Sequence, residues 1–235
     1  MSAHEGLRVI VTGAASGIGR GIASRLQEAE ARVVGLDIDE VSTAFPMLRA
    51  DLRNEAEIVA AVASAADRLG GLDAIVNAAG IGRASRLDAF NLAAFDEMFS
   101  VNVRGAVIVA REALRYLDGR GRIVNISSEL AYIGRANASG YCATKAAMLA
   151  LTRSWARELA PDILVNAIAP GPIDTEANRT TTPQEMVADI VKNIPLSRMG
   201  QPDDLVGMCL FLLSDEARWI TGQIFNVDGG QIIRS

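Results

Sequence analysis

A glycine-rich turn between a strand and a helix constrains this chain more than any other feature. The apolar segment Leu7–Thr12 reads as a buried strand, and Gly13-Ala14-Ala15-Ser16-Gly17-Ile18-Gly19 follows it directly. A helical pattern through Ile22 and Leu26 comes next. Backbone N–H groups and the helix dipole at such a turn favour an anion such as a pyrophosphate. The spacing G-x-x-x-G-x-G is not the usual G-x-G-x-x-G, and a plain connection is the alternative.

A second strand, Arg32–Asp37, ends in a carboxylate at the distance expected beyond a dinucleotide-binding turn. Such a carboxylate accepts hydrogen bonds from both ribose hydroxyls and repels a 2′-phosphate. Ile38 and Asp39 follow it, where an arginine would accommodate that phosphate. The sequence therefore predicts NAD as the cofactor in preference to NADP.

Length, charge and cysteine content exclude several classes of protein. The chain has 235 residues, enough for one α/β domain, and we find no internal boundary, so residues 1–235 are predicted to form one domain. A net charge of −5 with scattered arginines argues against nucleic acid binding. No transmembrane run or signal peptide is evident, and a cytoplasmic protein is expected. Cys142 and Cys209 read as structural thiols in a reducing compartment.

The single histidine, His4, falls in what the sequence predicts to be a mobile N-terminus. This removes a Ser-His-Asp triad and a histidine-based metal site from consideration, and no metal is expected.

Further strands are predicted near Met47–Ala50, at Leu72–Val76 and at Gly121–Ser128. The link of residues 38–46 is too short for an ordinary crossover, so its helix must be a single turn or missing. Asn54 is expected to cap a helix. Asn102 falls inside a helical region, where asparagine has poor propensity, so a structural hydrogen bond or a catalytic role should offset that cost.

Tyr141 and Lys145 are four residues apart at the start of an apolar helical run, so they lie on one face. A free tyrosine has a pKa of about 10, and a nearby lysine together with a cationic cofactor ring lowers it toward neutrality. This pair suggests acid–base chemistry, whereas an aromatic packed beside a solvated lysine is the alternative. The same helix is apolar almost all round, which predicts that another subunit covers its second face.

The rest of the chain holds a strand at Asp162–Ile168, a helix opened by Pro202 and ending near Leu213, and a final strand at Gln223–Val227. Residues 174–195 are polar and threonine-rich, which is typical of a mobile lid over a substrate.

The order and spacing of these motifs resemble the short-chain dehydrogenase/reductase family from about Leu7 to Gly230. The matching features are Thr12-Gly13-x-x-x-Gly17-Ile18-Gly19, Asp51-Leu52, Asn77-Ala78-Ala79-Gly80, Asn102, Ser128, Tyr141-x-x-x-Lys145 and Pro170-Gly171. The resemblance implies a Rossmann-like, doubly wound α/β sheet of about seven mostly parallel strands in three layers. One departure is the shortened link between Asp37 and Asp51, which leaves the cofactor preference resting on Asp37.

The resemblance also implies a catalytic tetrad of Asn102, Ser128, Tyr141 and Lys145, with Ser127 as the fallback for Ser128. In it, Tyr141 is the general acid or base, Ser128 bonds the substrate oxygen, Lys145 lowers the tyrosine pKa and holds the nicotinamide ribose, and Asn102 positions a water. The cofactor-binding residues implied are Gly13, Ser16, Gly17, Ile18, Gly19, Asp37, Asp51, Leu52, Asn77, Ala78, Ala79, Gly80, Tyr141, Lys145, Pro170, Gly171, Ile173 and Thr175.

These expectations describe an NAD-dependent oxidoreductase acting on a small secondary alcohol or its ketone. Two alternatives stay open: a 3-oxoacyl-thioester (acyl-carrier-protein) reductase, and a non-catalytic sensor of NAD. Glu129 and Tyr132 are expected to line the substrate pocket, and Arg83, Arg135 and Arg179 either meet a substrate anion or lie on the surface. Family members commonly form tetramers, so a homotetramer or homodimer is expected.

Overall fold

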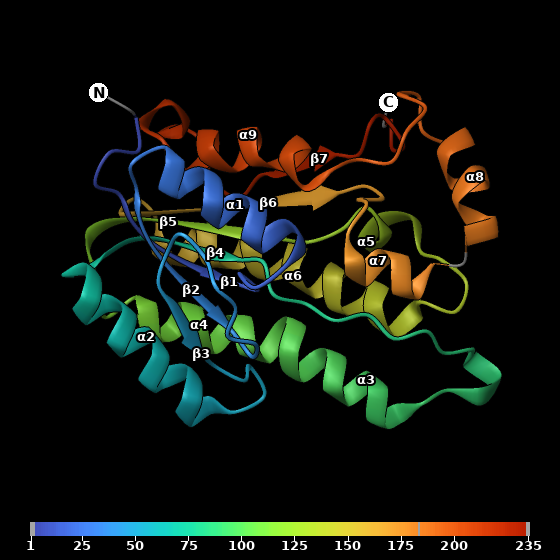
Figure 1. The fold of residues 1–235 in the computed structure, drawn as a ribbon, viewed down its shortest axis with the longest axis horizontal. Coiled ribbons are helices and arrows are strands. Elements are labelled where there is room, and N and C mark those ends of the chain that lie inside the picture. The colour runs from blue at the N-terminus through green and yellow to red at the C-terminus, as the bar shows by residue number, and fades with distance from the viewer. Residues whose placement is uncertain (1–2, 183, 234–235) are drawn as a thin grey trace.

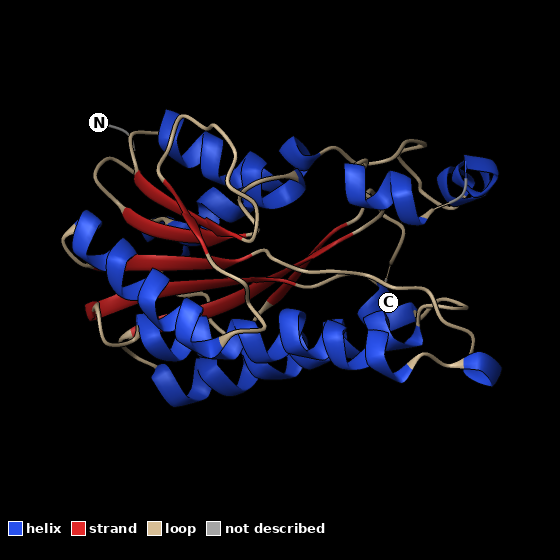
Figure 2. Ribbon diagram, turned by 60° about the horizontal axis from the view of Figure 1, so that its bottom comes forward, coloured by secondary structure: helices blue, strands red, loops and turns tan. Residues whose placement is uncertain are grey.

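Seven parallel strands form one sheet in the order β3-β2-β1-β4-β5-β6-β7 (Figures 1 and 2). The computed structural model describes residues 3–182 and 184–233. The strands are β1 Arg8–Thr12, β2 Arg32–Asp37, β3 Met47–Arg49, β4 Leu72–Asn77, β5 Leu117–Ile126, β6 Ile163–Pro170 and β7 Ile224–Val227.

Helices cover both faces of the sheet, which gives the three layers expected from the sequence. Figures 1 and 2 show α1 and α9 on one face and α2, α4 and α6 on the other. The helices are α1 Gly17–Glu28, α2 Glu55–Leu69, α3 Leu92–Phe99, α4 Ala106–Ala113, α5 Leu130–Ile133, α6 Ser139–Leu159, α7 Glu176–Thr181, α8 Gln184–Lys192 and α9 Pro202–Leu213, with 3₁₀ turns at Leu87–Ala89 and Asp215–Ala217 and a π-helical segment at Ser100–Gly105.

The core has two halves because successive strand residues point to opposite faces. Ile10 packs with α2 residues such as Ile58, whereas its neighbour Val11 packs with Ile22 of α1 and Leu205 of α9. Strands buried on both faces are apolar throughout, as is typical of a parallel sheet between helical layers.

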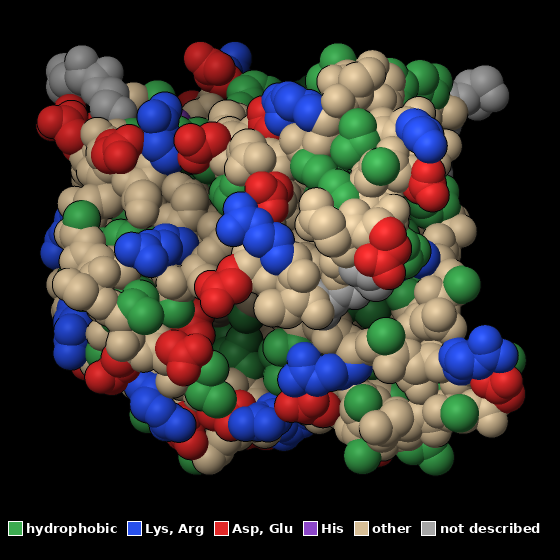
Figure 3. Space-filling view, turned by 45° about the vertical axis from the view of Figure 1, so that its right-hand side comes forward, with side chains coloured by type: hydrophobic (Ala, Val, Ile, Leu, Met, Phe, Trp, Pro, Cys, Tyr) green, Lys and Arg blue, Asp and Glu red, His purple; other side chains and the backbone are tan. Residues whose placement is uncertain are grey.

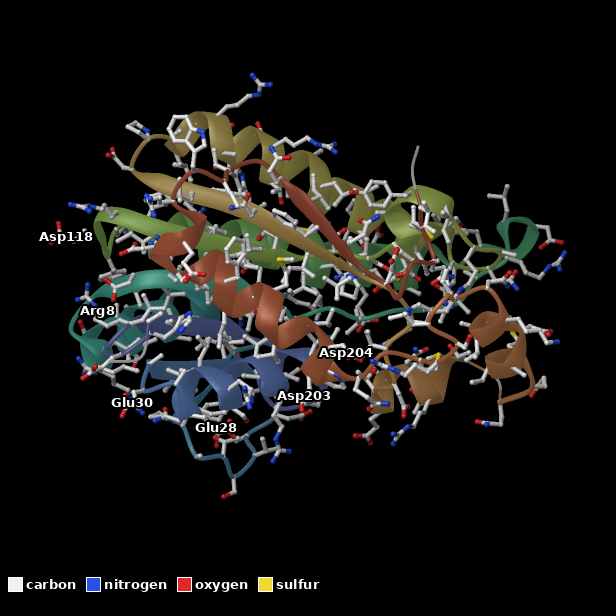
Figure 4. The ribbon with its side chains drawn as sticks, turned by 90° about the horizontal axis from the view of Figure 1, so that it is seen from above. Arg8, Glu28, Glu30, Asp118, Asp203 and Asp204 are labelled. Atoms are coloured by element: carbon white, nitrogen blue, oxygen red, sulfur yellow. The ribbon has the colours of Figure 1, made fainter. Side chains whose placement is uncertain are left out.

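The carboxyl ends of all the strands lie at one edge of the sheet, because every strand pair is parallel. The chain passes from β1 outward through β2 and β3 and then returns to β4 on the other side of β1. Ligands of such sheets bind at the carboxyl edge beside this switch point. In Figure 4, Arg8 and Asp118 mark the opposite end of the sheet, away from α7 and α8.

Local signals predicted most element boundaries. The link between β2 and β3 carries no helix, Asn54 caps α2 by accepting from the backbone N–H groups of Ala56 and Glu57, and α9 runs from Pro202 to Leu213. The strand predicted at Gly121–Ser128 differs: β5 starts at Leu117 and ends at Ile126. A register shift between Leu72 and Ala74 lets β5 begin early, and Ser127 and Ser128 lie beyond the strand.

The prediction of a mobile segment around His4 is wrong. The His4 side chain is buried, and its Nε2 lies 2.9 Å from the carbonyl oxygen of Leu210 in α9. The backbone N–H of Gly6 also donates to the carbonyl oxygen of Glu30. The terminus is therefore attached to the α1 and α9 layer, through a contact 206 residues away that no local pattern reveals.

The surface carries interspersed charges of both signs on the face drawn in Figure 3. Among the described residues, no helix is long and apolar enough to cross a bilayer, and no cluster of three or more His, Cys, Asp or Glu side chains is arranged to hold a metal ion.

Candidate active site

The glycine turn after β1 lies against the segment that follows β4. Gly13 has a positive φ of 69°, and a Cβ at this position would lie 2.8 Å from Cα of Ala79. The hydroxyl of Thr12 accepts from the backbone N–H groups of Ala78 and Ala79, both at 3.1 Å. Glycine is therefore required at position 13, and the two predicted cofactor-binding segments lie side by side at the carboxyl edge of the sheet.

The N-terminus of α1 fits a bound anion. Ser16 is the N-cap residue, but its side chain makes no capping hydrogen bond, and the first turn of α1 contains no acidic residue. The N–H groups at the start of this helix are therefore not used by a side-chain cap, and no acidic side chain within the first turn repels negative charge. A dinucleotide pyrophosphate would be held here by Gly17, Ile18 and Gly19.

Asp37 lies beside the same turn, as its position at the end of β2 predicts. Its Oδ2 accepts from the backbone N–H of Ala15 at 2.9 Å, and its Oδ1 accepts from that of Asp39 at 3.2 Å. The side chain is only partly buried. The carboxylate is thus oriented by the glycine turn while keeping lone pairs for ribose hydroxyls.

Three of the predicted cofactor-binding residues are engaged within the protein. Asp51 is bound by Arg53 through Nε and Nη2, at 2.9 and 2.7 Å, which holds the pKa of the carboxyl below its ordinary value. Leu52 is buried in the core. The Asn77 side chain is also buried and donates to Oδ1 of Asn125 at 2.9 Å. For Leu52 and Asn77, the structure leaves the backbone as the part that can face a ligand.

The two serines after β5 have different surroundings. Ser127 donates its hydroxyl hydrogen to the carbonyl oxygen of Lys145 at 2.8 Å. Ser128 lies beside Tyr141, close enough to lower the pKa of the phenol. The Ser127 hydroxyl is already used to join β5 to α6, so Ser128 is the serine whose side chain lies beside the tyrosine.

Lys145 is buried beneath Tyr141. Its Nζ donates to the carbonyl oxygen of Ile126 at 2.9 Å and lies 5.7 Å from the centroid of the tyrosine ring. Burial lowers the pKa of Lys145 to about 8. A Cβ on Gly80 would lie 3.2 Å from Nζ, so glycine at position 80 leaves room beside the ammonium group.

The protein's own groups raise the pKa of Tyr141, contrary to the prediction that Lys145 lowers it. Burial is the largest cause, the charge of Glu129 is the next, and together they raise the pKa to about 12. The hydrogen bond from Ser128 and the charge of Arg135 act in the opposite direction. The cationic ring of a bound cofactor is therefore the remaining group expected to bring the pKa of Tyr141 toward neutrality.

Asn102 lies in the π-helical segment between α3 and α4. Its Oδ1 accepts from the N–H of Ile81 at 2.8 Å, and its Nδ2 donates to the carbonyl oxygen of Ile81 at 2.9 Å and to the Thr144 hydroxyl at 3.0 Å. Thr144 in turn donates to the carbonyl oxygen of Tyr141. These hydrogen bonds offset the poor helix propensity of asparagine and connect Asn102 to the helix that carries Tyr141.

The segment after β6 approaches the glycine turn from the other side. A Cβ on Gly17 would lie 3.4 Å from Cγ2 of Thr175, and the Thr175 hydroxyl caps α7 by accepting from the N–H of Asn178. Ile173 is buried, and its carbonyl oxygen accepts from Nδ2 of Asn178. The carbonyl oxygen of Pro170 accepts from the N–H of Glu129, so this segment is also tied to the end of β5.

Glu129 is predicted only to line the substrate pocket, but its side chain contacts Ser128 directly. It is buried, and its Oε2 accepts from the Ser128 hydroxyl at 3.0 Å. Burial is the main cause that raises its pKa to about 7. The sequence offers its adjacency to Ser128 as a signal, but only the tertiary structure shows that the side chain turns inward.

The other suggested substrate contacts are placed differently. Tyr132 lines a hollow beside β7 together with Arg153 and Phe225. Arg179 forms a two-pronged ion pair with Asp174, and Nη2 of Arg83 lies 3.5 Å from the Glu97 carboxylate. Arg135 is exposed, but its charge lowers the pKa of both Glu129 and Tyr141, so it is the arginine that acts on the centre.

A parallel sheet with a dinucleotide-type turn and a Ser–Tyr–Lys group at its carboxyl edge defines a dehydrogenase or reductase of the Rossmann-like type. Comparison with known proteins agrees. The profile of the family described as enoyl-(acyl carrier protein) reductase matches residues 13–231. An uncharacterized oxidoreductase of Mycobacterium tuberculosis is 46% identical over 96% of this chain and 97% of its own length.

Two solved structures are similar over nearly the whole chain. The aldohexose dehydrogenase of Thermoplasma acidophilum has a TM-score of 0.94 and 30% identity, covering 100% of this chain and 97% of that one. The 3-ketoacyl-(acyl-carrier-protein) reductase of Brucella melitensis, complexed with NADH, has a TM-score of 0.91 and 35% identity, covering 97% and 99%. This chain belongs to the short-chain dehydrogenase/reductase family, whose members use a nicotinamide cofactor.

Proposed function

We propose that this protein is an NAD(H)-dependent oxidoreductase that interconverts a secondary alcohol and its ketone, with Tyr141 as general acid and base. The observation that carries the proposal is the placement of Ser128 beside the Tyr141 phenol, with Lys145 buried and its Nζ 5.7 Å from the centroid of the tyrosine ring. No other group of described residues on this edge of the sheet combines a hydroxyl donor, a proton donor and a cation beside a nucleotide-type turn.

The proton chemistry follows from this geometry. With a pKa of about 12, the Tyr141 phenol is protonated at neutral pH and donates its proton to a carbonyl oxygen as hydride arrives at the carbon. Ser128 holds that oxygen by a hydrogen bond. In alcohol oxidation the phenol must first lose its proton, and the positive charge of a bound nicotinamide ring would favour the phenolate. The nicotinamide cofactor, when bound, supplies or accepts the hydride.

Asp37 supports NAD as the cofactor. Its carboxylate is fixed beside the N-terminus of α1 by the N–H of Ala15 and is followed by exposed Ile38. A 2′-phosphate would place negative charge against this carboxylate without a cation directly after it in the chain. The NADH complex of the similar Brucella enzyme is in keeping with this preference.

Two kinds of substrate follow from the similar proteins. Aldohexose dehydrogenase suggests a sugar or polyol, and 3-ketoacyl-(acyl-carrier-protein) reductase suggests an acyl thioester. We favour the small polar substrate, because the buried Glu129 carboxyl beside Ser128 and the Arg135 charge acting on it make the surroundings of Ser128 polar. The thioester reductase is the second candidate.

A substrate panel tests both candidates. Initial rates are measured with NAD and NADP on sugars, polyols and simple secondary alcohols, and with NADH and NADPH on ketones and 3-oxoacyl thioesters. We expect NAD-linked turnover of a hydroxylated substrate that Tyr141→Phe abolishes while cofactor binding is retained. Tyr132→Phe is the matched control: it removes a tyrosine hydroxyl in the hollow beside β7, away from Ser128 and Tyr141, and should leave turnover unchanged. NADPH-linked reduction of thioesters alone would favour the second candidate, and NADH binding without any turnover would contradict both.

We further propose two structural roles. Residues 174–195, which include α7 and α8, act as a lid over the substrate, because Thr175 at the start of this segment lies against Gly17 of the glycine turn. A second copy of the chain covers the outer face of α6, where Ala143, Ala146 and Ala150 are exposed. A dimer or tetramer in sedimentation analysis that Ala146→Asp reduces to monomers is the expected result.

A further inference from the structure

We propose that Glu129 is a positioning residue, whose own protonation decides whether the Ser128 hydroxyl hydrogen is available to the substrate oxygen. The inference rests on the proposed function, because it assigns to Glu129 control over a hydrogen bond that this function requires. It concerns a buried carboxyl group that the reaction itself does not use.

The two side chains are in direct contact inside the protein. Oε2 of Glu129 lies 3.0 Å from Oγ of Ser128, and both residues are buried, with 5% and 6% of their surfaces exposed. The N–H of Glu129 donates to the carbonyl oxygen of Pro170 at 2.9 Å, which fixes the backbone at the start of α5. The carboxyl group therefore has a fixed partner and little access to water.

Counting hydrogens at Ser128 gives two distinct states. A serine hydroxyl has one hydrogen to donate and two lone pairs that accept. The N–H of Leu130 already donates to Oγ at 3.2 Å. An ionised Glu129 can only accept, so it takes the Ser128 hydrogen. A protonated Glu129 can instead donate to Oγ, which fills the second lone pair and directs the serine hydrogen to the substrate carbonyl.

Charged groups on each neighbouring element influence this choice. Tyr141 faces Glu129 from α6, Arg135 from the loop after α5, and Asp228 from the turn after β7. Arg135 favours the ionised carboxylate, whereas Asp228 and burial favour the acid, so the pKa of Glu129 is raised to about 7. α6 also carries Cys142, whose charge acts on Tyr141, and Lys145, which donates to the carbonyl oxygen of Ile126.

Ketone reduction should therefore weaken as Glu129 ionises. Above its pKa, the protonated fraction of a single group falls about tenfold for each pH unit. Ionised Glu129 removes the Ser128 hydrogen bond to the substrate oxygen, so kcat for reduction follows the protonated fraction. We expect kcat of the wild-type enzyme to fall about twentyfold between about pH 6 and pH 8, about tenfold from Glu129 and about twofold from the loss of the Lys145 proton.

Glu129→Gln tests this expectation, because the amide keeps an N–H donor for Oγ of Ser128 at every pH. The kcat of this variant should fall about twofold or less over the same range, because only the loss of the Lys145 proton near pH 8 still lowers it. Glu112→Gln is the matched control, since Glu112 is also buried but pairs with Arg111 on α4 and with Arg115 just after it. The Glu112→Gln enzyme should keep the wild-type dependence of kcat on pH. A Glu129→Gln enzyme with the wild-type profile would overturn the proposal while leaving the oxidoreductase function intact.

A second measurement does not need turnover. In protein labelled with ¹³C at glutamate carboxyls, the resonance missing from Glu129→Gln should titrate near pH 7, and Ser128→Ala should raise its midpoint because the Ser128 hydrogen bond lowers this pKa. Asp228→Asn should lower the midpoint. An ordinary midpoint of about 4, or one unaffected by Ser128→Ala, contradicts the proposal even if no substrate is found.

Discussion

The hydroxyl of Ser127 donates to the main-chain carbonyl oxygen of Lys145 at 2.8 Å, across the junction between β5 and α6. Its neighbour Ser128 instead bonds the side chains at the reaction centre. Two adjacent residues of one type therefore have separate tasks: Ser127 holds α6 on the sheet, whereas Ser128 holds the substrate oxygen in the proposed reaction.

Ser127→Ala and Ser128→Ala should accordingly have opposite effects. Ser127→Ala leaves a buried carbonyl without its partner and should reduce the free energy of unfolding by about 1–3 kcal/mol, with kcat changed only a few-fold. Ser128→Ala should reduce kcat by about a hundredfold or more with little loss of stability. Urea unfolding and initial rates on the same preparations measure both effects. Loss of turnover in Ser127→Ala alone would reverse the assignment.

Lys145→Met should stabilise the fold at neutral pH while abolishing turnover. In the folded protein the lysine pKa is lowered from 10.5 to about 8, so below pH 8 both states carry the proton and the full cost of the buried charge is present, at most about 3 kcal/mol. Between about pH 8 and 10.5 the unfolded chain holds more protons, so wild-type stability rises with pH.

The advantage of Lys145→Met should therefore shrink toward zero by about pH 10.5. Thermal unfolding across this range is the measurement. Lys192→Met is the control, because this exposed lysine pairs with Asp189 on the surface and its removal should change stability by less than about 0.5 kcal/mol at any pH. An advantage that does not depend on pH would indicate better packing and not relief of a buried charge.

Asp37→Asn should reduce the preference for NADH over NADPH by about tenfold or more. The amide oxygen still accepts from the N–H of Ala15, so the turn is kept while the charge that repels a 2′-phosphate is removed. Kinetic constants for both cofactors measure the ratio. Asp39→Asn removes an exposed charge two residues away, and an equal change there would assign the preference to general surface charge.

Asn102→Ala should cost stability as well as activity. The substitution leaves the partly buried N–H and carbonyl oxygen of Ile81 without their side-chain partners, and we expect a loss of about 2–4 kcal/mol. Asn91→Ala, which removes only the N-cap of α3, should cost about 1 kcal/mol in the same urea titration. Similar losses for the two variants would mean that the Ile81 contacts add nothing to the fold.

The sequence by itself determined what depends on neighbouring residues. Glycine spacing defined the turn before α1, the Tyr141–Lys145 interval placed both side chains on one helix face, and Pro202 marked the start of α9. Apolar strands separated by helical patterns were sufficient for a parallel sheet. Such features are readable because backbone conformation and hydrophobic periodicity act over a few residues.

Only the tertiary structure decided which groups of distant segments meet. His4 reaches Leu210, Asn102 reaches Ile81 and Thr144, and Lys145 lies on the Ile126 carbonyl, all through contacts that no local pattern encodes. Burial then sets the chemistry: it raises the pKa of Tyr141 and Glu129 and lowers that of Lys145. These shifts come from the loss of water around each group, which depends on how the whole chain packs.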